Sequence, residues 1–318
     1  KMKILLIGDP HFKENNAYES NQFIEEIYKL LEKVNYDKII ILGDILDSHE
    51  KISLRSLCKS IDFIYKLSGK SKVYLLIGNH DRINNAVFLT EEHPFTALKN
   101  QKNIVVVDKV IKEEDFIYVP YVPTGMFKKA LETIEYDIKK IKIIFAHQEF
   151  KNSIFKDQGD IPPEGPLIYS GHIHNYKKLD NVTYVGTPFQ HSFYDNPDKF
   201  VMQLDIDDEK ISEEKIYLNI IKKRIKEINI NQLEDYKVDK NFLTKLVING
   251  DRKLLESKKA QEILKNPNIS YKLNYQKKET NQKKEEVFGD FDQLLEKRLE
   301  TEDKQIKILY QKLKQKLK

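Results

Sequence analysis

Seven side chains able to bind metal ions are spread over the first 175 residues, and each follows a short apolar run. They lie in the segments GDPHF, GDILD, GNHD, FAHQE and SGHIH, and they are Asp9, His11, Asp44, Asn79, His147, His172 and His174. The preceding runs are short and apolar, as buried strands are, and they cover residues 3–7, 38–42, 72–77, 141–145 and 167–169. We therefore expect five strands that end at one shared edge, where these side chains meet.

Two segments between the first runs show the periodicity of helices. Apolar residues recur at 3.6-residue spacing over residues 23–34 and again over residues 57–67. Strand and helix in alternation predict an α/β fold with a site at the carboxyl ends of the strands.

The donor set mixes carboxylate, imidazole and carboxamide groups and includes no thiolate. This mixture suits Mn, Fe or Zn better than Ca. Two such ions side by side can activate water and stabilise the oxygens of a displacement at phosphorus, with one carboxylate between them. We expect two Mn ions, with Fe, Zn or Mg as the alternatives.

The order of the five segments resembles that of the calcineurin-like metallophosphoesterases, which is D-x-H, GD, GNH[DE], H and GH-x-H. The resemblance implies a β-sandwich flanked by helices. It also implies a role for each ligand: Asp9, His11 and His174 for one ion, Asn79, His147 and His172 for the other, and Asp44 as the bridge. It implies that His80 contacts the phosphate and protonates the leaving oxygen. A scaffold that has lost its metals is the alternative, but every ligand position is intact.

Three further features resemble the SbcD-type subfamily, the nuclease subunits of double-strand-break repair and recombination complexes. The chain has GNHD rather than GNHE, a Gly-Thr-Pro turn in VTYVGTPFQHSF, and a long extension beyond a core of about 200 residues. Asp47 stands where archaeal and eukaryotic members commonly have histidine, which favours the bacterial and phage branch. The resemblance implies a Mn-dependent DNA nuclease, exonuclease or endonuclease, that works with an SMC-like (SbcC-type) ATPase.

The extension predicts further parts of the chain. We expect a metallophosphoesterase (nuclease) domain over residues 1–212, a small α/β capping domain over 213–276, a charged linker over 277–287 and C-terminal amphipathic helices over 288–318. In the capping domain we expect strands at 215–230, 242–248 and 269–275 and a helix at 252–264. The apolar stripes of the C-terminal helices lie beyond the linker, so we expect them to dock on the ATPase. The alternative is that they fold back on their own domain.

Further residues are candidates for substrate contact, namely Asp47, His49, Arg82 and His191, although an ordinary surface role is the alternative for each. The net charge of +4, from 54 basic and 50 acidic residues, does not by itself indicate nucleic-acid binding. Basic residues in the loops after the strands would have to contact DNA phosphates. A homodimer through the helix at residues 53–67 is a further expectation.

The bulk properties lead us to expect an intracellular protein. Cys58 is the single cysteine, so no internal disulfide can form, and the apolar runs are too short to span a membrane. Two other functions stay open: a phosphodiesterase or phosphatase acting on a small molecule or protein, and a metal-free binding module.

Overall fold

The computed structural model describes residues 1–48, 51–207, 210–250, 255 and 257–274. Contacts along the chain divide it into Lys1–Tyr275 and Gln276–Lys318. His49, the predicted linker and the predicted C-terminal helices lie outside the described residues, so those expectations stay predictions. No helix in the described ranges is both long enough and apolar enough to cross a membrane.

The first of two large sheets carries the N-terminal strands. Its order is β12-β11-β1-β2-β3-β4. The four parallel strands are β1 (Met2–Ile7), β2 (Lys38–Ile41), β3 (Lys72–Leu76) and β4 (Ile104–Val107). The two antiparallel strands at one side are β11 (Val201–Ile206) and β12 (Ile211–Ile216).

The second large sheet has the order β5-β6-β7-β8-β10-β9. Its parallel strands are β6 (Phe116–Val119), β7 (Ile143–Ala146), β8 (Leu167–Ser170) and β10 (Val182–Tyr184). Antiparallel strands close both sides, β5 (Ile111–Glu113) and β9 (Lys177–Leu179). All five predicted strands are present, but the expectation of one shared edge is wrong. Three of the strands belong to the first sheet and two to the second. The sequence could not show this division, because buried strands of either sheet have the same apolar pattern.

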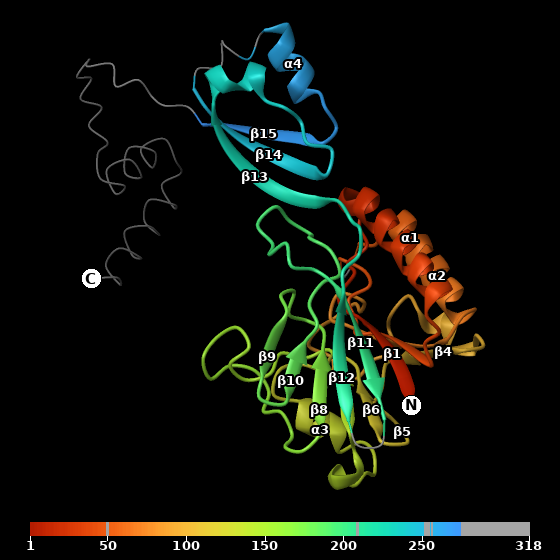
Figure 1. Ribbon diagram of the computed structural model, residues 1–318. Coiled ribbons are helices and arrows are strands. Elements are labelled where there is room, and N and C mark those ends of the chain that lie inside the picture. Colours follow the sequence, from red (N-terminus) through yellow and green to blue (C-terminus); the bar gives the residue numbers. More distant parts are fainter. Residues whose placement is uncertain (49–50, 208–209, 251–254, 256, 275–318) are drawn as a thin grey trace, which may run out of the picture. The chain divides into compact units, whose positions relative to one another are not determined.

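The two sheets pack face to face with helices outside them (Figure 1). Alternate residues of β1 show the layering: Ile4 and Leu6 face the second sheet, whereas Leu5 and Ile7 face the helices. The helices that cover the first sheet are α1 (Ala17–Lys33) and α2 (Leu54–Ser68), and α3 (Phe127–Leu131) lies on the second. Short 3₁₀ turns occur at Glu14–Asn16, Thr96–Asn100 and Ile138–Lys140. The predicted class, an α/β sandwich flanked by helices, is confirmed.

A small sheet follows the sandwich in sequence. It consists of three parallel strands, β13 (Lys222–Asn229), β14 (Phe242–Asn249) and β15 (Ile269–Asn274). A 3₁₀ turn (Ile230–Asp235) follows β13, and α4 (Lys258–Leu264) precedes β15. Side chains including Leu233, Leu246 and Leu264 give this sheet a core of its own.

Two predicted elements in this part of the chain differ from the structure. The single strand expected at 215–230 is wrong, since β12 ends at Ile216 beside β11 and β13 begins at Lys222 beside β14. The sandwich therefore continues past the expected domain boundary at residue 212. The helix begins at Lys258, where the Ser257 side chain accepts a hydrogen bond from the Ala260 amide, rather than at 252.

A polar cluster joins the two large sheets at the end where β2 and β3 begin. Glu113, from the second sheet, accepts hydrogen bonds from Lys38 (2.6 Å), Lys72 (2.9 Å) and the Tyr74 hydroxyl (2.5 Å) of the first. Burial by itself raises the pKa of Glu113, but these three donors outweigh it and lower the pKa to about 2. The carboxylate therefore joins the sheets at the edge opposite the predicted metal ligands.

Candidate metal centre

The carboxyl ends of five strands bring the seven predicted ligands together, three strands from the first sheet and two from the second. Asp9, Asp44 and Asn79 follow β1, β2 and β3, whereas His147 and His172 follow β7 and β8. Three ligands have left-handed backbones, with φ of 45° at His11, 48° at Asp44 and 77° at His172. Such conformations are uncommon outside glycine and gather at functional sites. We call the seven residues the metal centre.

Asp9 has the surroundings of a cation ligand. It is fully buried, and neither of its carboxylate oxygens has a hydrogen-bond partner among the described residues. An isolated buried carboxylate is costly, and a bound cation would offset that cost. Burial raises the pKa of Asp9 to about 7, with the nearby Asp44 adding to the effect and His147 opposing it.

His11 and His174 lie close to each other and to Asp44 in one half of the centre. Their Nε2 atoms are 3.1 Å apart, and His11 Nε2 is 3.6 Å from Asp44 Oδ2. Burial lowers the pKa of both imidazoles, so both are neutral at physiological pH. Two neutral ring nitrogens and a carboxylate that converge in this way fit one transition-metal ion.

His147 has a fixed tautomer in the other half of the centre. Its Nδ1 donates to the Leu42 carbonyl (2.7 Å), which leaves a lone pair on Nε2. This Nε2 lies 3.0 Å from Asn79 Oδ1 and 3.3 Å from Asp44 Oδ2. His172 Nδ1 is 2.8 Å from the same Asn79 oxygen. Several acceptors face one another here, so a cation fits this half as well.

The charges around His147 agree with that conclusion. Burial by itself lowers the pKa of His147, but Asp44 and then Asp9 raise it to about 9. Without a cation, the carboxylates thus favour a proton on the Nε2 of His147, and a bound cation would take the place of this proton. Burial also lowers the pKa of His172 to about 4, which keeps this imidazole neutral, as a metal ligand must be.

Asp44 has the position expected of a bridge. Within the described residues it belongs to both groups of side chains close enough to share an ion, His11 with His80 and His147 with His172. Its Oδ1 also accepts a hydrogen bond from the His80 amide at 2.8 Å. One carboxylate therefore reaches both halves of the centre.

His80 lies next to the metal centre, close enough to His11 and Asp44 to share an ion with them. Its Nδ1 donates a hydrogen bond to the Asp47 carbonyl at 2.7 Å, which fixes the orientation of the ring. The predicted role, protonation of the leaving oxygen, stays a prediction. The alternative, that His80 binds a metal, would show as metal loss on its removal.

The four predicted substrate contacts have different outcomes. Asp47 lies at the rim, where its carboxylate pairs with Lys13 at 2.8 Å, and the ring of His191 lies 5.2 Å from that of His11. His49 is outside the described residues. Arg82 is only 2 % exposed, and its guanidinium donates to the carbonyls of Tyr121 and Val87. Its predicted contact with substrate is not supported, because the side chain is buried and both of its terminal nitrogens bind carbonyls inside the protein.

Asp81 is a structural residue of the centre that sequence reasoning missed. Its buried carboxylate accepts from the backbone amides of Leu46 (2.9 Å), Gly78 (3.0 Å) and Ile45 (3.4 Å). It therefore ties the loop of Asp44 to the loop of Asn79. The signal in the sequence was the last letter of GNHD, which we used only as a mark of subfamily.

Tyr121 is a second missed residue. It follows β6 in the second sheet just as His147 follows β7 and His172 follows β8. Its ring centroid is 6.2 Å from that of His147 and 6.0 Å from that of His172. The apolar run FIYV that precedes Pro120 and Tyr121 could have placed Tyr121 at this edge, because that run has the pattern of one more buried strand.

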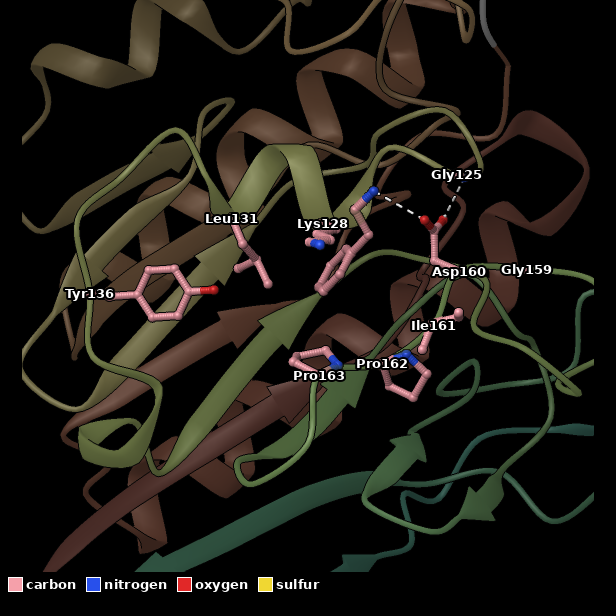
Figure 2. Close-up of a pocket in the computed structure, with 10 residues that line it drawn as sticks. Gly125, Lys128, Leu131, Tyr136, Gly159, Asp160, Ile161, Pro162 and Pro163 are labelled. Atoms are coloured by element: carbon pink, nitrogen blue, oxygen red, sulfur yellow. Dashed lines mark hydrogen bonds between the residues drawn. The ribbon is translucent and has the colours of Figure 1, made fainter.

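A separate cavity of about 660 Å³ lies beside α3 and includes none of the seven ligands (Figure 2). Ile161, Pro162 and Pro163 form part of its apolar wall. Asp160 accepts hydrogen bonds from the amides of Gly125 and Phe127 at this wall, and from Gln148, the neighbour of His147. The cavity is therefore a neighbour of the metal centre and not the reaction site.

Known proteins resemble this chain over most of its length. Residues 2–271 match the calcineurin-like phosphoesterase family. A protein provisionally named phosphoesterase 078R, from Invertebrate iridescent virus 3, is 35% identical over 266 residues, which are 79% of this chain and 77% of that protein. Phosphoesterase 244L, also provisionally named, from Invertebrate iridescent virus 6, is 35% identical over 279 residues, which are 82% of this chain and 99% of that protein.

A crystal structure of Pseudomonas putida nuclease MPE matches with a TM-score of 0.34 and 19% identity, over 63% of this chain and 83% of that one. A likeness this distant supports no conclusion about substrate. The sequence match and the two viral relatives do establish the family, and the ligand set agrees with them. This chain belongs to the calcineurin-like phosphoesterase family, whose members are metal-dependent phosphoesterases.

Proposed function

We propose that this chain is a Mn-dependent DNA nuclease of the SbcD type, which hydrolyses phosphodiester bonds with two metal ions. The observation that carries the proposal is a centre in which Asp44 lies within reach of both halves. When bound, two ions at such a centre supply a hydroxide nucleophile at neutral pH and stabilise the charge that develops on phosphoryl oxygens.

The residues of the chain prepare the site for this chemistry. The Leu42 carbonyl fixes the tautomer of His147, and Asp81 fixes the loops that carry Asp44 and Asn79. Through its contact with the Asp47 carbonyl, His80 keeps a proton on Nδ1 and can donate another from Nε2 to the leaving oxygen. The mixed nitrogen and oxygen donors favour Mn over Mg, which prefers oxygen ligands and retains its water.

The choice of DNA as substrate is supported by features around the centre. The sequence carries GNHD and the Gly-Thr-Pro turn of the SbcD-type nucleases. The loop after that turn bonds to the start of the small sheet, because Gln190 exchanges hydrogen bonds with the backbone of Lys223 at 2.7 and 3.1 Å. A sheet joined to a loop of the centre suits a long substrate that extends beyond the reacting phosphate.

Partners follow from the same assignment. We propose that residues 288–318 dock on an SMC-like ATPase, since their sequence has two apolar stripes beyond a charged linker. We also propose a homodimer through α2, which exposes Leu54 (77%) and Tyr65 (60%) to solvent. Large apolar side chains left exposed on one helix are typical of a surface that another chain covers.

One assay separates the proposal from its alternatives. The purified chain is incubated with single-stranded DNA, double-stranded DNA, bis(4-nitrophenyl) phosphate and 4-nitrophenyl phosphate, each in Mn and then in EDTA. A nuclease cleaves DNA and the simple diester in Mn only. Hydrolysis of the monoester with no DNA cleavage would instead indicate a phosphatase. No turnover of any substrate would indicate a binding module.

A further inference from the structure

Tyr121 is held rigidly beside the half of the metal centre that contains Asn79, His147 and His172. Its amide donates to the carbonyl of Ile77 at 2.8 Å, two residues before Asn79. Its own carbonyl accepts from Arg82 Nη1 at 2.9 Å, and the Arg82 guanidinium lies 5.6 Å from the centre of its ring. Both ends of the residue are therefore fixed by the segment around Asn79.

The hydroxyl of Tyr121 has no task within the part of the chain that the structure describes. No hydrogen bond joins it to another described residue, and it is not among the buried polar atoms that lack a partner. The residue itself is half-buried, with its ring against two imidazoles of the centre. A tyrosine hydroxyl carries a proton that it can donate in a hydrogen bond.

We propose that the Tyr121 hydroxyl donates a hydrogen bond to a non-bridging phosphoryl oxygen of the phosphodiester, and that Arg82 positions Tyr121 for this contact. The inference rests on the proposed phosphodiester hydrolysis. It also gives Arg82 a role: its guanidinium holds the residue that contacts the phosphate, while its own donors stay inside the protein. A fixed donor aimed at charge that grows in the transition state accelerates the reaction without reorganisation.

The first test compares Tyr121→Phe, which removes only the hydroxyl, with Tyr121→Ala, which also removes the ring. We expect Tyr121→Phe to lower kcat/KM for bis(4-nitrophenyl) phosphate by about 10- to 100-fold. Tyr121→Ala should lower kcat/KM by little more than Tyr121→Phe does. Both should keep the wild-type metal content by elemental analysis. Tyr217→Phe is the matched control, because Tyr217 is 61% exposed just after β12 and should leave the rate unchanged.

Inhibition by orthovanadate tells contact with the phosphate from a general structural effect. Five-coordinate vanadate resembles the transition state, so Tyr121→Phe should weaken its inhibition by the same factor as kcat/KM. The proposal would be overturned by a wild-type rate in Tyr121→Phe, by unchanged vanadate inhibition, or by loss of metal. A defect confined to Tyr121→Ala would also overturn it, and would mean that the ring itself packs against the substrate.

The positioning role of Arg82 is tested by a double-variant cycle. Arg82→Gln should lower kcat/KM. The double variant should have nearly the same kcat/KM as Tyr121→Phe alone, because both changes act through the one hydrogen bond from the Tyr121 hydroxyl to the phosphate. Full additivity would overturn this part. If Arg82→Gln does not fold, Tyr121→Phe alone decides the central claim. If the wild type cleaves the simple diester but not DNA, the nuclease assignment fails while the test of Tyr121 stands.

Discussion

Gly171→Ala should damage the metal centre without removing any ligand. A β-carbon at this position would lie 2.5 Å from Asp9 Oδ1, 2.6 Å from the Leu42 carbonyl oxygen and 2.8 Å from His147 Nδ1. Real β-carbons do not approach other atoms so closely. The first of these atoms belongs to a ligand, and the other two form the hydrogen bond that fixes the tautomer of His147.

The size of the effect follows from those contacts. Overpacking a tight site costs about 1–3 kcal/mol, and here the relief must move a carboxylate and an imidazole that are predicted metal ligands. We therefore expect a loss of about 2–4 kcal/mol in metal binding, which is about 30- to 700-fold in the dissociation constant for Mn. The variant should keep its far-ultraviolet circular dichroism, because the sandwich core is untouched.

The assay is calorimetric titration of Mn into metal-free protein. Gly69→Ala is the control, because its new β-carbon would meet only the Lys66 carbonyl oxygen, at 3.3 Å, at the end of α2. A folded Gly171→Ala protein with wild-type affinity for Mn would refute the reasoning, since the added β-carbon would then fit beside Asp9 and His147 without moving them.

Three other predictions concern single groups and the C-terminal segment. Asp44→Ala should lose metal and activity together, whereas His80→Ala should keep both metals and lose about 100-fold in rate; an empty site in His80→Ala would make it a ligand. Because Lys38 and its neighbours lower the pKa of Glu113 from 4.5 to about 2, its stabilisation is present above pH 4.5 and lost as pH falls toward 2. Glu113→Gln should therefore unfold more easily than wild type in urea at pH 7 by about 1–2 kcal/mol, a gap that closes at low pH; a constant gap would contradict this. Removal of the residues after Glu286 should leave Mn-dependent cleavage of short single-stranded DNA intact and abolish co-purification with the ATPase; an unchanged complex would end the docking proposal.

The ligands could be predicted from the sequence because each one follows a strand in a recognisable segment. Parallel strands end at the same edge, so Asp9 and Asp44 had to meet whatever the details of packing. The sequence could not assign the strands to two sheets, since β2 and β7 are both short, mainly apolar and buried on their two faces. Which strands pair within each sheet, and how the two sheets pack, depends on long-range contacts that a local sequence pattern does not show.

The residues that support the ligands were harder to predict. Asp81 and Tyr121 act through contacts with segments far away in sequence, and Arg82 looked like a phosphate ligand until its burial was known. The break between Ile216 and Lys222 was missed for a similar reason. The chain there stays rich in isoleucine and leucine while it passes from one sheet to another.

The central claim is a two-metal centre that cleaves phosphodiester bonds, and one titration tests it most directly. Mn is added stepwise to metal-free protein while bound metal per chain and the rate of DNA cleavage are measured in the same samples. We predict saturation at two Mn per chain, with cleavage that rises as the second ion binds and stops in EDTA. Saturation at one ion per chain, or cleavage that persists in EDTA, would contradict the account.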